Sequence, residues 1–93
     1  PVGRAALLAA REKKKKAADK KKAAEYLKAA LAIDPDNINT LFFLGELQHK
    51  QGDNAAARAS FEKALATPPR SGREVADAGR RREIRQALVS LQP

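Results

Sequence analysis

The chain repeats itself with an offset of 34 residues. When residues 16–35 are laid over residues 50–69, seven of the twenty positions are identical. The identical pairs are Lys16/Lys50, Asp19/Asp53, Ala23/Ala57, Ala30/Ala64, Leu31/Leu65, Ala32/Ala66 and Pro35/Pro69. A period of about 20–50 residues is typical of arrays in which each unit buries its apolar face against its neighbours. We therefore expect a stack of similar units.

Within one period the residues favour a pair of helices. Twenty of the 93 residues are alanine, the strongest helix former. Leu41, Leu44 and Leu47 recur at helical spacing, and Pro35 and Pro69 each stop a helix because the residue before a proline avoids the helical region. We expect an all-α fold without strands and with about five helices, near residues 4–16, 20–33, 38–51, 54–67 and 73–91.

The boundary residues between the third and fourth of these helices have specific expected roles. Gly52 can adopt the positive φ that ends a helix, and Asp53 or Asn54 can cap the next one. Asn37 can cap the helix that begins at Ile38. Gly45 and Ala57 are small where two antiparallel helices must approach closely.

Residues 38–71 resemble one complete tetratricopeptide repeat. Leu41, Leu44 and Gly45 fall on the family's positions four, seven and eight, and Ala57, Phe61, Ala64 and Pro69 on positions 20, 24, 27 and 32. Only Gln48 departs, at the usually aromatic position eleven. The resemblance implies a right-handed solenoid of antiparallel helix pairs.

The resemblance organises the whole chain, residues 1–93, as a single domain. Residues 4–35 are a degenerate repeat, in which Arg11 replaces the small residue at position eight and Lys14 the aromatic one at position eleven. Residues 38–71 are the well-matched repeat, and residues 73–91 are expected to be a C-terminal capping helix.

The composition argues against catalysis and cofactor binding. The chain has no cysteine and one histidine, so we expect no catalytic residues, metal site or cofactor. No apolar stretch reaches the ~18 residues that span a bilayer. Because the chain begins at Pro1, we expect a fragment or processed form, to which further repeats could belong. The compartment stays open, since bacterial cytoplasm and periplasm are both compatible.

The formal net charge of +8 is concentrated at the two ends of the chain. Residues 1–33 carry ten basic and three acidic side chains, and residues 70–93 carry six and three. Such runs can mark a nucleic-acid or anionic membrane surface. No aromatic residues alternate with the lysines to stack on bases, so we favour a solvated helix face and do not expect nucleic-acid or membrane binding.

Protein binding is the function that the resemblance implies, because the first helix of each tetratricopeptide repeat lines a concave groove for peptides. The positions that face this groove hold Leu8, Glu12, Asn39, Phe42, Glu46, His49, Arg73 and Arg80. Phe42 lies off the leucine stripe of its helix and is the expected aromatic anchor. The alternatives are a structural or self-associating segment of a larger protein and a basic adaptor for nucleic acid or anionic membrane.

Overall fold

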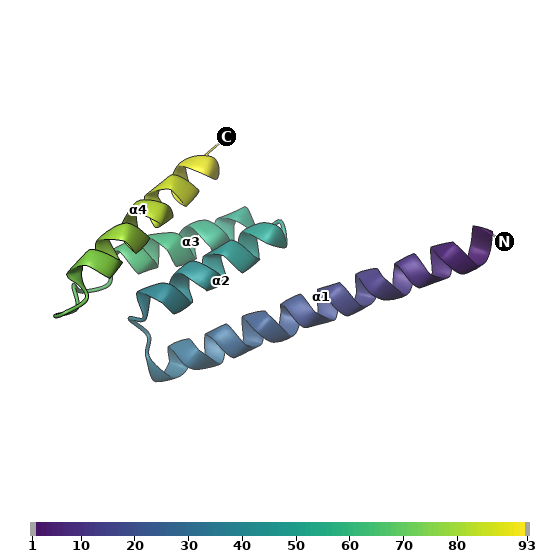
Figure 1. The fold of residues 1–93 in the computed structure, drawn as a ribbon, viewed down its shortest axis with the longest axis horizontal. Coiled ribbons are helices and arrows are strands. Elements are labelled where there is room, and N and C mark those ends of the chain that lie inside the picture. The colour runs from purple at the N-terminus through teal and green to yellow at the C-terminus, as the bar shows by residue number, and fades with distance from the viewer. Residues whose placement is uncertain (1, 93) are drawn as a thin grey trace.

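Four helices make up the fold in a computed structural model, which describes the backbone of residues 2–92 and the side chains of residues 18–92. They are α1 (Val2–Ile33), α2 (Ile38–Lys50), α3 (Asn54–Leu65) and α4 (Glu74–Ser90) (Figure 1). The described residues contain no strand, which confirms the all-α prediction. The expected count of five helices is wrong, because the helices expected at residues 4–16 and 20–33 are one continuous helix.

The continuity of α1 has a local cause at Ala18. The equivalent residue 34 positions further along is Gly52, which has a φ of 83° in the turn between α2 and α3. An L-residue in that conformation costs roughly 1–2 kcal/mol, whereas alanine is the best helix former. The segment assigned to the degenerate repeat therefore lacks the glycine that would let it turn back, and α1 runs straight past the α2–α3 pair (Figure 1).

The predicted boundaries of α2 and α3 are confirmed to within two residues. The side chain of Asn37 accepts a hydrogen bond from the Thr40 backbone N–H at 3.1 Å, and Asp53 accepts one from Ala56 at 3.1 Å. Each cap satisfies an N–H that the first turn of a helix leaves without a partner. Together with the turn at Gly52, they orient α2 and α3 as an antiparallel pair.

The core forms around α2, which contacts all three other helices. Its buried side chains are Ile38, Leu41, Phe42 and Leu44. Phe61 of α3 is 2% exposed and lies against Gly45, where the two helices cross. Ile84 and Leu91 extend the same cluster onto α4, and Leu31 of α1 packs against it from the other side.

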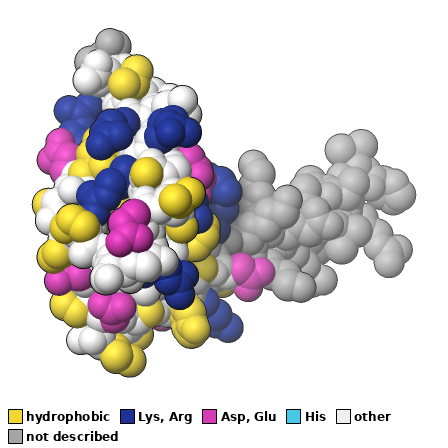
Figure 2. Space-filling view, turned by 60° about the vertical axis from the view of Figure 1, so that its left-hand side comes forward, with side chains coloured by type: hydrophobic (Ala, Val, Ile, Leu, Met, Phe, Trp, Pro, Cys, Tyr) yellow, Lys and Arg dark blue, Asp and Glu magenta, His cyan; other side chains and the backbone are white. Residues whose placement is uncertain are grey.

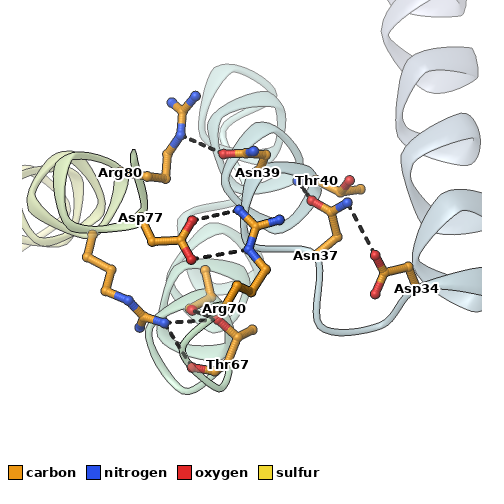
Figure 3. Close-up of polar contacts among 10 residues, drawn as sticks. Asp34, Asn37, Asn39, Thr40, Thr67, Arg70, Asp77 and Arg80 are labelled. Carbon is orange, nitrogen blue, oxygen red and sulfur yellow. Dashed lines mark hydrogen bonds and ion pairs between the residues drawn. The ribbon is translucent and has the colours of Figure 1, made fainter. Parts of the chain in front are cut away.

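Arginine side chains attach α4 to the α2–α3 pair. Arg81 donates from Nη1 to the Leu65 carbonyl at 2.8 Å and from Nη2 to the Thr67 carbonyl at 2.9 Å, at the C-terminus of α3 (Figure 3). The Leu65 carbonyl belongs to the last turn of α3, where carbonyls have no partner within the helix. The half-buried side chain of Arg81 therefore caps α3.

A second polar contact holds the loop between α3 and α4. Arg70 donates from Nε and Nη2 to the two carboxylate oxygens of Asp77, at 3.1 and 2.6 Å (Figure 3). Asp77 is 5% exposed. The hydrogen bonds from Arg70 lower the pKa of Asp77, an effect that outweighs the opposing cost of burying the carboxylate. Asp77 is thus a structural residue of the α4 N-terminal turn.

Candidate partner-binding surface

One face of α2 that is not buried in the core stays accessible beside α4. It carries Asn39, Phe43, Glu46 and Lys50, which follow one another at helical spacing and lie on one side of the helix. Phe43 is 47% exposed, a large fraction for an aromatic side chain. We refer to these four residues, with Arg80 of α4, as the α2–α4 surface.

Arg80 joins the two helices at this surface. Its Nε donates to Oδ1 of Asn39 at 3.0 Å (Figure 3). Its Nη1 pairs with Glu83 at 3.2 Å. Its guanidinium carbon lies 4.4 Å from the centre of the Phe42 ring and 5.2 Å from that of Phe43. Such cation–π contacts position the guanidinium over the aromatic faces. Arg80 is therefore held in place while its side chain stays partly exposed.

The structure buries Phe42, which we expected to be an exposed anchor. Phe42 is 6% exposed, and its ring centre lies 6.0 Å from that of Phe61. The reason is that α2 is covered by three helices rather than one, so its buried arc is wider than the leucine stripe. Ile38, Leu41, Phe42 and Gly45 follow the spacing i, i+3, i+4, i+7, a signal in the sequence that predicts this burial. The same pattern leaves the adjacent Phe43 exposed.

A small pocket lies further along the same two helices. Its volume is about 240 Å³, and it is lined by Glu46, His49, Lys50, Phe61, Ala87, Ser90 and Leu91. His49 is exposed and hydrogen-bonded through Nδ1 to Oδ1 of Asn54 at 3.0 Å. The floor is largely apolar and the rim is charged, which suits one apolar side chain of a partner.

The remaining predicted groove residues lie apart from this surface or outside the description. Arg73 is exposed and directly precedes α4, where its side chain makes no capping hydrogen bond. Leu8 and Glu12 lie outside the residues whose side chains the structure describes. Of the eight predicted residues, the structure thus places Asn39, Glu46, His49 and Arg80 along accessible parts of α2 and α4.

The described part of the chain contains no candidate metal centre. No group of three or more His, Cys, Asp or Glu side chains among these residues could hold a metal ion. None of the described helices has the length and apolar character needed to cross a membrane. On the face drawn in Figure 2, the described Lys and Arg side chains lie among hydrophobic and acidic ones.

Comparison with known proteins gives one match. A family model described as tetratricopeptide repeat matches residues 15–81, which is more than two thirds of the chain. Neither curated protein sequences nor solved structures gave a significant match. The matched range includes the C-terminal half of α1, all of α2 and α3, and the first half of α4.

Proposed function

Because the chain belongs to the tetratricopeptide repeat family, whose repeats generally mediate protein–protein interaction, we propose that it is a non-catalytic module that binds a peptide or protein tail along the α2–α4 surface. The observation that carries this proposal is the exposed Phe43 beside the fixed guanidinium of Arg80. Aromatic and arginine side chains dominate binding energy at protein interfaces.

The chemistry of the surface defines the partner that fits it. An apolar side chain of the partner would contact Phe43, and a second one would enter the pocket beside His49. That pocket, at about 240 Å³, is below the roughly 300–1,000 Å³ of small-molecule sites, so a side chain fits it better than a cofactor does. Arg80 and Lys50 favour an acidic group or chain-terminal carboxylate between the two contacts.

The test uses peptides selected from a random 12-residue library on the wild-type protein. Phe43→Ala should weaken binding of the selected peptides at least fivefold, with little change in the melting temperature because Phe43 is half-exposed. Val75→Ala is the matched control: Val75 is 89% exposed and lies on the side of α4 opposite to Arg80. It should leave the affinity unchanged.

An amide chemical-shift titration identifies the surface that the peptides use. The proposal expects the largest perturbations between residues 39 and 50 and along α4. Perturbations confined to residues 20–28 that disappear at high salt would contradict it and favour the basic-adaptor alternative. Equal effects of Phe43→Ala and Val75→Ala would also contradict it.

A further inference from the structure

A stripe of apolar side chains on α1 is not covered by any of the described helices. Ala23, Tyr26, Ala30 and Ile33 follow one another at spacings of three and four residues, so they lie on one face of α1. Tyr26 is 76% exposed and Ile33 is 89% exposed. We call these four residues the α1 stripe. It differs from the side of α1 on which Leu31 packs against the core.

The residues that correspond to the α1 stripe in the next repeat are buried. The residues 34 positions further along are Ala57, Ser60 and Ala64 of α3 and Thr67, two residues after its end, and their exposed fractions are 0, 8, 0 and 7%. In that pair α2 covers the stripe: Gly45 lies against Phe61, and Ser60 donates to Oε1 of Gln48 at 2.6 Å. The α1 stripe has the larger side chains of Tyr26 and Ile33 where the next repeat has Ser60 and Thr67, and none of the described helices lies over it as α2 lies over α3.

The N-terminal segment of the same chain, or of a second copy, is a poor cover for this stripe. By the repeat register Arg11 would occupy the place of Gly45, where α2 and α3 cross too closely for a β-carbon, and it would face Leu27, which stands at the place of Phe61. An antiparallel arrangement would also bring Lys13–Lys16 next to Lys20–Lys22. Steric crowding and charge repulsion therefore oppose both a folded-back hairpin and a swapped dimer.

The charges beside the stripe identify a better partner. Lys20 and Lys22 lie on the two flanks of the stripe, Lys21 and Lys28 lie further round the helix, and Asp19 continues the stripe towards the N-terminus. Residues 1–33 as a whole carry ten basic and three acidic side chains, with Lys13–Lys16 among the basic ones. We propose that the α1 stripe binds an acidic amphipathic helix of another protein, with small residues facing Tyr26 and Ile33 and carboxylates beside the lysines. This site lies on a different helix from the α2–α4 surface, so it goes beyond the function proposed above.

The natural composition of the chain supplies the assay. Tyr26 is the one tyrosine and the chain has no tryptophan, so tyrosine emission reports directly on the stripe. The probe is a designed 18-residue amphipathic helix of Leu, Ala and Glu without aromatic residues. Its twin has every Glu replaced by Lys. The acidic peptide should bind and protect Tyr26 from quenching by acrylamide, and the lysine twin should bind at least tenfold more weakly.

Two matched variants locate the binding site. Ile33 and Val75 are both 89% exposed, on α1 and α4. Ile33→Thr, which introduces the residue found 34 positions further along at Thr67, should weaken binding of the acidic peptide at least tenfold. Val75→Thr should leave it unchanged, and so should Phe43→Ala, which affects only the α2–α4 surface.

Several outcomes would overturn the proposal. Equal affinity for the two peptides would refute the acidic partner, and equal effects of Ile33→Thr and Val75→Thr would refute the stripe as the site. Protection of Tyr26 in the peptide-free protein would also overturn it. The molar mass from light scattering would then show what covers the α1 stripe. A dimeric mass indicates a second copy, and a monomeric mass indicates the N-terminal segment of the same chain.

Discussion

Gly45 and Phe61 meet where α2 crosses α3, and the space between them leaves no room for a methyl group. A β-carbon on residue 45 would come within 2.5 Å of Cε1 of the Phe61 ring. Phe61 itself is 2% exposed and cannot move into solvent without opening the core. This contact sets the distance between the two helices that form the well-matched repeat.

Gly45→Ala should therefore destabilise the protein by about 1–3 kcal/mol, the typical cost of overpacking a core. Gly79 provides the control, because it is helical but has no atom within 4 Å of an added β-carbon. Gly79→Ala should stabilise by about 0.5–1 kcal/mol, since alanine is the better helix former. Urea denaturation of both variants measures the difference. Equal changes at the two sites would mean that α2 and α3 do not cross closely at Gly45.

The adjacent aromatic residues of α2 should behave in opposite ways on truncation. Phe42 is 6% exposed and Phe43 is 47% exposed. Phe42→Ala should cost about 3–5 kcal/mol, a large part of the stability of a small domain. Phe43→Ala should cost less than about 1 kcal/mol because much of its ring is already in water. Thermal melting of the two variants distinguishes them, and a more damaging Phe43→Ala would reverse our assignment of the buried face.

The ion pair between Arg70 and Asp77 should make stability depend on acid pH. The pKa of Asp77 is lower in the folded state than its usual value near 4, chiefly because of the hydrogen bonds from Arg70. The pair therefore stabilises the fold above about pH 4 and loses this effect as the pH falls through and below that range. The melting-temperature gap between wild type and Asp77→Asn should be largest near neutral pH and shrink towards about pH 3. A gap that stays constant over this range would show that Asp77 is not held by Arg70 in its charged form.

The features that could be predicted from the sequence are those with local causes. The turn at Gly52 and the caps at Asn37 and Asp53 depend on the conformations and hydrogen bonds of neighbouring residues, and the structure has all three. The close approach at Gly45 also follows from a local feature, the absence of a side chain at the crossing.

Most features that could not be predicted from the sequence depend on contacts between distant parts of the chain. Phe42 is buried because α4 and its Arg80 cover the side of α2 that the leucine stripe leaves open. Arg81 caps α3 across 16 residues of sequence, which no helical pattern reveals. The continuity of α1 is the exception, because its cause is local: Ala18 stands at the position that Gly52 occupies 34 residues further along.

The central claim is that α1 continues as one helix and leaves its stripe open. The chain has no cysteine, so the variant Ala10→Cys/Ala29→Cys can carry two spin labels at defined positions. Along one helix the labelled backbones lie about 28 Å apart, at 1.5 Å per residue. In a folded-back hairpin they would lie about 10 Å apart, the usual distance between packed helices. Pulsed electron-spin resonance on a dilute sample should give the long distance. A dominant short distance would contradict the continuous helix and the open α1 stripe together.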